Sequence, residues 1–341
     1  MITEADNAMV WDGKKAGHYE VWYATFNHRL TSTGFWIRYT LESPLEGRGG
    51  PHATLWFAFF DARNPERNWA IHRSHPIGEL ASEASPFKVA IGNDALLRHD
   101  GMRGVIAGDA HSASWELAYT PCNFTHRHLP DLVYPRGFAE TKVLSPNLII
   151  NLHGTVVVDG AIYTFDGDPG CQTHLWGRKH AHAWAWTHCN AFREDPTVCL
   201  EALSLRMRRG GVVLPTLTFL SLYLGSEVYH FRMVQDVPFT RGSWETGLYR
   251  FSATNRRVRV EGELRCRPED LVKTMYSDPD GEPSFCHNSE VADCALTFSM
   301  RRSLASPFKR VHRLTSRGAA HFEYASRVPD GHVTKRHVSL T

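Results

Sequence analysis

Apolar and polar residues alternate with a period of two through almost every hydrophobic stretch of this sequence. This alternation is typical of β-strands that bury one face. Turn-forming segments such as residues 47–51 and 278–281 separate the stretches, and no segment carries a capped helical pattern longer than a turn or two. The sequence therefore predicts an all-β protein with short helices at most. The clearest predicted strands are residues 19–26, 35–41, 53–60, 112–119, 148–158, 197–205, 217–224 and 295–300.

The composition argues against several classes of protein. The 341 residues carry 38 Lys and Arg against 36 Asp and Glu, and this near balance argues against binding to nucleic acid by bulk charge. The N-terminal segment is polar and charged, and nowhere do about 18 apolar residues run together, so we expect neither a signal peptide nor a membrane span. The 7 cysteines are scattered without a CxxC pair, which fits reduced thiols. We predict a cytoplasmic protein.

A faint internal duplication indicates two domains. Setting Trp22 against Trp184 also aligns residues 54–57 with residues 216–219 at the same offset. Chance similarity between alternating strands is the other explanation. Each half has enough strands for a closed or nearly closed antiparallel β-barrel, which leaves no free edge. The predicted domains are residues 1–165 and residues 166–341.

The segment 181–191 is unlike the rest of the chain. If it is a strand, its large side chains share one face and its small side chains share the other. Indoles interleaved with imidazoles and an amide make a wall that can hold a hydrocarbon or ring system and also bind polar groups. The other explanation is that the Trp side chains fill a barrel and the His side chains lie at its wet rim. The large face carries His182, Trp184, Trp186, His188 and Asn190.

This part of the chain resembles a known family. Trp176-Gly177, followed by residues 184–192 (WAWTHCNAF), is similar to the W-G … W-x-W-x-x-C-N-x-F stretch of tocopherol cyclases. Residues 19–23 (YEVWY) are similar to the aromatic F-E-G-W-Y opening that tocopherol cyclases share with lipocalin-like carotenoid 1,2-hydratases. The resemblance is loose over most of the chain and close only around Trp176. It implies two tandem lipocalin-like, calycin-like antiparallel β-barrels.

The resemblance also implies a kind of chemistry. Members of the family bind isoprenoids, polyenes or polyketide-like molecules. They protonate a carbon–carbon double bond, which leads to hydration or cyclisation, or they steer a pericyclic ring closure. An apolar pocket folds the substrate, an acid delivers a proton, and indole faces stabilise a developing carbocation. The resemblance therefore implies a reaction that needs no metal or redox cofactor.

The proton-handling residues depart from the family pattern. Carotenoid hydratases pair a His-x-Trp on one strand with a Tyr-x-Asp on the next; His182-Ala183-Trp184 matches the first pair, but no Tyr-x-Asp follows it. Glu201 lies in the next strand among apolar residues, where burial would raise its pKa and keep a proton available. The alternative is that Glu201 faces solvent. We predict Glu201 and His182 as the catalytic residues, with Glu20, Asp166 and Asp168 as weaker candidates.

Other kinds of site have less support. His180 and His182 could share a face as zinc ligands do, but close pairs arise by chance among 20 histidines, and we predict no metal site. No Gly-x-Ser-x-Gly elbow, Walker loop or Gly-x-Gly-x-x-Gly follows a predicted strand. Hydrolase, nucleotide-binding and dinucleotide-binding functions are therefore unsupported.

These observations predict one deep, largely apolar pocket near the junction of the two halves. We expect an isomerase, cyclase or hydratase that acts without a cofactor on a hydrophobic terpenoid, polyene or polyketide. A non-catalytic carrier or sensor of a lipid-like ligand would need the same pocket and is the alternative. The expected partner is this small molecule and not nucleic acid, with transient membrane contact during lipid loading. The predicted substrate-binding residues are Trp176, Trp184, Trp186, His188, Asn190 and His174.

Overall fold

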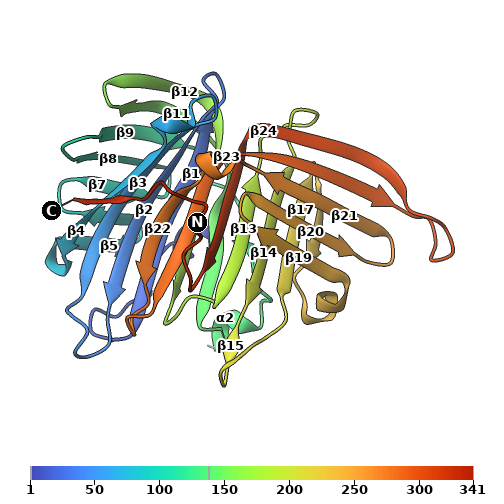
Figure 1. The fold of residues 1–341 in the computed structure, drawn as a ribbon, viewed down its shortest axis with the longest axis horizontal. Coiled ribbons are helices and arrows are strands. Elements are labelled where there is room, and N and C mark those ends of the chain that lie inside the picture. The colour runs from blue at the N-terminus through green and yellow to red at the C-terminus, as the bar shows by residue number, and fades with distance from the viewer. Residues whose placement is uncertain (1, 137–138, 341) are drawn as a thin grey trace.

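Two large β-sheets make up almost all of the computed structural model, which describes residues 2–136 and 139–340 (Figure 1). The prediction of an all-β chain is confirmed. No helix in the described part of the chain is long and apolar enough to cross a membrane. The helical segments are α1 (Ile2–Ala5), α2 (Val133–Arg136) and 3₁₀ turns at Pro65–Arg67, Ile77–Glu79, Val234–Phe239 and Pro268–Asp270.

The first sheet has 13 strands and is built mainly from the N-terminal half of the chain. Its neighbouring strands are antiparallel except at one edge, where β25 pairs in parallel with β4. From edge to edge its strands are β25 (Val338–Leu340), β4 (Trp69–Pro76), β3 (His52–Asp61), β2 (Thr33–Ser43), β1 (His18–His28), β12 (Ala161–Gly177), β11 (Thr141–Val158), β9 (Ser112–Tyr119), β8 (Gly101–Ala107), β7 (Ala95–Arg98), β6 (Phe87–Ile91) and β5 (Leu80–Ala84), with β10 (His126–Arg127) beside β11.

The second sheet has 10 strands and is formed by the C-terminal half. A separate short hairpin joins β15 (Arg208–Arg209) and β16 (Val212–Val213). From edge to edge the sheet contains β18 (Glu227–Phe231), β17 (Leu217–Leu224), β14 (Cys199–Arg206), β13 (Ala183–Cys189), β24 (Lys309–Ser326), β23 (Pro283–Met300), β21 (Val258–Arg265), β20 (Leu248–Thr254) and β19 (Thr240–Glu245), with β22 (Val272–Ser277) beside β23.

The two sheets share one strand order. The first contains the consecutive neighbours β4-β3-β2-β1-β12-β11, and the second contains β18-β17-β14-β13-β24-β23 in the same places. A short extra strand pairs with the corresponding long strand in each sheet, β10 with β11 and β22 with β23. The same topology therefore occurs twice along the chain. The domain boundary predicted after residue 165 falls within β12, and the division into two domains stays a prediction.

Each sheet encloses a hydrophobic core of its own. In the first sheet, the inward face of β1 contributes Trp22, Ala24 and Phe26 to a core cluster that also includes residues of β3, β6 and β9. In the second sheet, the inward face of β13 contributes only the small Ala185 and Cys189. Because side chains alternate along a strand, the large residues of β13 must point out of this second core.

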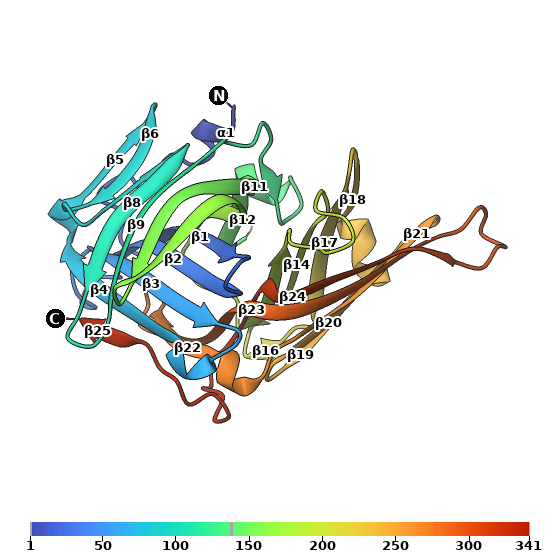
Figure 2. The same cartoon turned by 90° about the horizontal axis from the view of Figure 1, so that it is seen from above.

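After β24 the chain returns to the first sheet. Val338 of β25 pairs with Ile71 of β4, and Leu340 pairs with Arg73. On the way, the backbone N–H of Lys273 in β22 donates to the carbonyl of Lys335. The last strand therefore lies against the first sheet although the strands before it belong to the second (Figure 2).

Candidate functional site

The outward faces of the two sheets pack against each other through a third hydrophobic cluster. Trp36 and Trp56 come from the first sheet, and Trp184 and Trp186 come from the second. The two sheets lie side by side in Figure 2, with β1 to β3 on one side of the junction and β14, β23 and β24 on the other. The aromatic wall predicted from the sequence thus faces the partner sheet, not the interior of its own sheet.

The outward face of the second sheet follows directly from its strand register. Trp186 on β13 lies opposite Leu203 of β14 and Glu323 of β24. His188 lies opposite Glu201 on one side and His321 on the other. Directly paired residues of an antiparallel sheet share a face. Two carboxylates, two imidazoles and two indoles are therefore gathered on one small area.

A cavity of about 130 Å³ lies between these faces. Its wall on the first-sheet side includes Tyr23, Trp36 and Arg38, and its wall on the second-sheet side includes Trp184, Trp186 and Glu323. The space is largely apolar, with Arg38, Glu323, His128 and His180 as its ionisable groups apart from tyrosines. The remaining lining residues are Leu129, Thr141, Val143, Leu175, Ala181, Leu203, Leu205 and Tyr276.

Glu201 is buried on β14 just behind this cavity. Its Oε2 accepts a hydrogen bond of 3.2 Å from the indole Nε1 of Trp186. Its Oε1 lies 3.6 Å from both His128 Nε2 and His188 Nδ1, beyond ordinary hydrogen-bond distance, and has no hydrogen-bond partner in the described structure. Burial raises the pKa of Glu201, against smaller opposing effects of His188 and Trp186. A protonated carboxyl group suits this position.

Glu323 on β24 is the second carboxylate, and it lines the cavity directly. Its Oε1 accepts a hydrogen bond of 2.5 Å from Trp184 Nε1. Glu323 is not among the site residues predicted from the sequence. The signal was available, because Glu323 stands in an apolar stretch of a strand, as Glu201 does.

His128 lies between the surroundings of Glu323 and those of Glu201. It lines the main cavity and also a small second cavity of about 10 Å³ beside Glu201. Burial lowers the pKa of His128 to about 3, so its imidazole is neutral at physiological pH. It lies in the connection between β10 and α2, a segment without a strand pattern from which His128 could have been predicted.

His188 has a second buried neighbourhood behind Glu201. Its ring stacks on that of His321, with the centroids 5.6 Å apart. His321 Nδ1 in turn contacts the buried Glu290 carboxyl group. Burial, with a smaller effect of Glu323, raises the pKa of Glu290 well above its usual range. Burial lowers the pKa of His321, so a neutral pair fits this setting.

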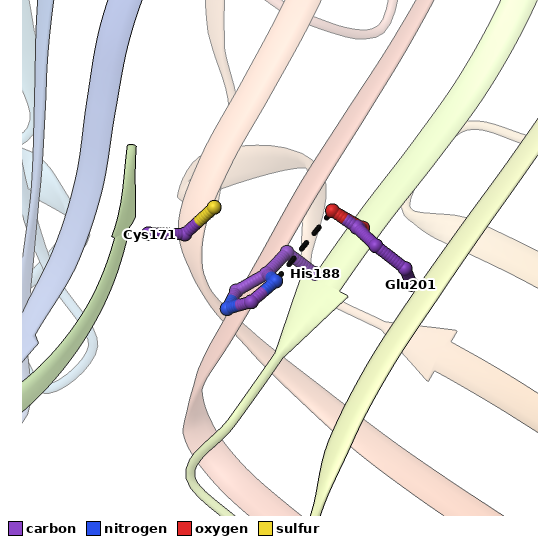
Figure 3. Close-up of side chains that lie close together, drawn as sticks. All are labelled: Cys171, His188 and Glu201. Atoms are coloured by element: carbon purple, nitrogen blue, oxygen red, sulfur yellow. Dashed lines mark ion pairs between the residues drawn. The ribbon is translucent and has the colours of Figure 1, made fainter. Parts of the chain in front are cut away.

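Cys171, His188 and Glu201 form the one buried group of three metal-type donors in the described residues (Figure 3). Their nearest donor atoms lie within 4.8 Å of one another. Three donors are too few for a closed structural zinc site, but they match the number of protein ligands in a catalytic zinc site, where water takes the fourth position. A second group, Asp278, Asp280 and Glu282, forms ion pairs with Lys179 and Arg327. The absence of a metal stays a prediction.

Of the eight predicted site residues, only Trp184 and Trp186 line the cavity. Glu201 and His188 lie behind it, and the other four lie elsewhere. His182 precedes β13 and lies in a polar pocket with Arg208. Burial lowers the pKa of His182, and the positive charge of Arg208 lowers it further. Asn190 donates from Nδ2 to the carbonyl of Gly170, 2.9 Å away. His174 is buried on β12, and Trp176 lies beside its ring at a centroid distance of 4.8 Å.

His174 serves a hydrogen-bonded cluster centred on Glu20. The Glu20 carboxylate faces Nε2 of His174 at 2.9 Å and Nε2 of His18 at 3.1 Å. It also accepts backbone N–H bonds from Val10 and Trp11. Burial alone would raise the pKa of Glu20, but these bonds prevail and lower it to about 2. This cluster holds the N-terminal segment against the first sheet.

Comparisons with known proteins agree with this architecture. The model of a family described as tocopherol cyclase-like matches residues 138–323. An uncharacterized protein found in two strains of Mycobacterium tuberculosis is 26% identical over 300 residues, covering 85% of this chain and 84% of that protein.

Two solved structures share the fold. A protein of Nitrosomonas europaea provisionally named AttH aligns with a TM-score of 0.56 and 12% identity, over 91% of this chain and 93% of that chain. Kievitone hydratase from Nectria haematococca aligns with a TM-score of 0.52 and 8% identity, over 90% of this chain and 88% of that chain. At these identities the likeness concerns the fold alone.

Proposed function

Because this chain belongs to the tocopherol cyclase-like family, we propose that it is an enzyme of the cyclase or hydratase type. Its substrate is a hydrophobic terpenoid, polyene or polyketide that binds in the cavity between the two sheets. The reaction begins when a protein carboxyl group protonates a carbon–carbon double bond. The resulting cation is then closed into a ring or captured by water. The kievitone hydratase fold relative is compatible with the second outcome.

One observation carries the proposal. Two carboxyl groups stand beside one aromatic cavity, and each accepts a hydrogen bond from a different indole of β13, Glu201 from Trp186 and Glu323 from Trp184. The pKa of Glu201 is raised by burial, which favours the protonated form that a general acid needs. Indole faces beside the reacting carbons would stabilise positive charge.

Side chains around the cavity have defined roles in the proposed reaction. Glu201 holds the proton, and neutral His128, which borders both cavities, passes it toward the substrate. Glu323 faces the substrate directly and is the alternative donor or the base that completes the reaction. His182 has no part in this version, because it lies in the separate polar pocket. His188 positions Glu201, and Trp184 and Trp186 hold the substrate.

The location also remains a proposal. All 7 cysteines are free thiols in the structure, and 5 of them are buried. Unpaired cysteines support a reducing compartment, and we propose the cytoplasm. Brief contact with a membrane would deliver a substrate of low solubility.

The direct test is transfer of deuterium to carbon. Native mass spectrometry and solvent extraction of the purified full chain would first identify any co-purifying terpenoid, polyene or polyketide. That compound, or otherwise a panel of these compounds, is then incubated with the protein in D₂O. The expected product contains one carbon-bound deuterium, because the first step adds a solvent-derived proton to the double bond.

Three variants sharpen this test. Glu201→Gln and Glu323→Gln should each still bind the compound, and the one that removes the acid should abolish deuterium incorporation. Glu116→Gln is the matched control, because Glu116 is exposed on β9 and is not one of the residues that line the cavity. Binding without turnover in the wild type would support the carrier alternative and would contradict the enzymatic proposal.

A further inference from the structure

Arg38 is a buried arginine without an acidic partner. Its side chain lies on β2 at the wall of the main cavity, and the residue is 6% exposed. Among described residues, no carboxylate oxygen lies within 4.0 Å of its guanidinium nitrogens. Arg327, another largely buried arginine, shows the contrast, because it lies 2.7 Å from the Asp278 carboxylate.

The protein uses only part of the Arg38 guanidinium. Nε donates to Thr40 Oγ1 at 3.0 Å, and the group lies 3.9 Å from the centre of the Tyr276 ring. The ring face supplies some electrostatic stabilisation. An arginine side chain has five N–H donors in a planar fork, so four remain on the two terminal nitrogens. These are the donors that bind a carboxylate with two parallel hydrogen bonds.

Burial makes this arrangement costly unless a ligand completes it. A guanidinium stays charged at all physiological pH values, so it cannot relieve its burial by losing a proton. A buried charge normally has a counter-ion. Glu323 is the carboxylate that shares the cavity, but it accepts its hydrogen bond from Trp184 and makes no ion pair with Arg38. A carboxylate from outside the protein would supply the missing counter-ion.

We propose that the cavity binds an organic carboxylate whose charged end pairs with Arg38 and whose apolar body lies against Trp184 and Trp186. A single carboxylate suits the site better than a phosphate, because Arg38 is its only Arg or Lys among the lining residues and Glu323 would oppose a second negative charge. Calling this ligand the substrate rests on the proposed function.

Pairing with Arg38 would also orient the ligand in the cavity. Arg38 belongs to the first sheet, whereas Glu323 and both indoles belong to the second. A carboxylate held at Arg38 would direct the far end of the molecule toward the acidic side chains of the second sheet. Such anchoring at a non-reacting end places the reacting carbon and limits the number of bound poses.

The test compares two ligands of the same shape. Naphthalene-2-carboxylate carries the charge, and naphthalene-2-carboxamide is its neutral counterpart; isothermal titration calorimetry measures the binding of each to the full chain at pH 7. The wild type should bind the carboxylate at least about tenfold more tightly than the amide, as expected for a bidentate charged pair. Arg38→Met should abolish this preference and leave amide binding within about threefold.

Arg206→Met is the matched control. Arg206 also donates from Nε to a threonine hydroxyl and lies over an aromatic ring, that of Trp244, but it is exposed and outside the cavity. This variant should bind both compounds as the wild type does. If Arg38→Met fails to fold, Arg38→Lys and Arg38→Gln replace it, and only the lysine variant should keep a preference for the carboxylate.

Three results would overturn the inference: equal binding of the two compounds by the wild type, an unchanged preference after the charge is removed, or no binding of either compound by folded protein. The test measures binding and not turnover. A preference that depends on Arg38 in a protein that never transfers deuterium would therefore support the anion site while contradicting the proposed enzyme. Deuterium transfer by a protein that does not prefer the carboxylate over the amide would support the proposed enzyme and contradict the anion site.

Discussion

Glu323 lies directly opposite Trp186 across β24 and β13, yet it accepts its hydrogen bond from Trp184. The same diagonal relationship recurs on the other side of β13, where Glu201 lies opposite His188 and accepts from Trp186. Long side chains reach diagonal neighbours on one face of an antiparallel sheet. Each carboxylate is therefore held by an indole two residues away from its register partner, and β13 joins the two acids into one site.

Replacing Trp186 by Phe should destabilise the fold by leaving Glu201 Oε2 without its donor. A buried polar atom that loses its partner costs about 1–3 kcal/mol. Urea unfolding of the two proteins would measure this difference in the free energy of unfolding. Trp244→Phe is the control, because Trp244 is only partly buried and its indole N–H makes no hydrogen bond within the described structure. Equal effects of the two substitutions would contradict the prediction.

The pH dependence of stability should reveal the protonated state of Glu201. Its pKa is raised in the folded protein, so the neutral form stabilises the fold at pH values below the ordinary 4.5, and this contribution is lost as pH rises through the folded value. Glu201→Gln cannot ionise and should lack that loss. Its stability relative to the wild type should increase with pH above about 4.5. Urea titrations between pH 4 and 8 test this, and a parallel curve for the variant would refute it.

Glu20→Gln should have the opposite signature. The pKa of Glu20 is lowered to about 2 in the fold, so its contribution is present above the ordinary value of 4.5 and disappears as pH falls toward 2. At neutral pH, Glu20→Gln should therefore lower the free energy of unfolding by about 3 kcal/mol. Acid unfolding followed by circular dichroism should show a shallower dependence between pH 4.5 and 2 for the variant. An unchanged slope would mean that Glu20 does not titrate as described.

Gly34→Ala should disturb the contact between the sheets. A methyl group on Gly34 of β2 would lie 2.5 Å from Glu290 Cβ and 2.6 Å from the Glu290 carbonyl oxygen on β23. Relief of such overlap by backbone shifts costs about 1–3 kcal/mol. Gly50→Ala is the control, because its methyl group would meet no heavy atom within 4 Å. Melting temperatures of the two variants measure the difference, and equal values would argue against close packing here.

Alternation in the sequence was sufficient to predict the sheets but not which face of a strand points inward. Both faces of β13 are buried, Ala185 in the core of its own sheet and Trp186 against the partner sheet. The duplicated register shows the same ambiguity. Trp22 was set against Trp184, but Trp22 points into its own core, so a shift of one residue is needed to bring equivalent faces together.

The site was predicted in part for a similar reason. Glu201 was noticed because a charged residue interrupts an apolar strand, and Arg38 and Glu323 satisfy the same criterion. What the sequence could not provide was the meeting of β2 with β24 across the junction, which depends on the packing of two sheets and not on any local pattern. His174 stands two residues before Trp176, where the motif that resembles the family begins, but its partner Glu20 is distant in the sequence.

The parallel pairing of β25 with β4 ties the two halves together mechanically. A protein made from the N-terminal strands alone would leave the edge of β4 uncovered, and exposed edges favour pairing with other chains. In a protein made from the C-terminal strands alone, β25 would lack β4, the strand with which it pairs. The halves are therefore poor candidates for separate expression or exchange, and pulling on the C-terminus would load the first sheet before the second.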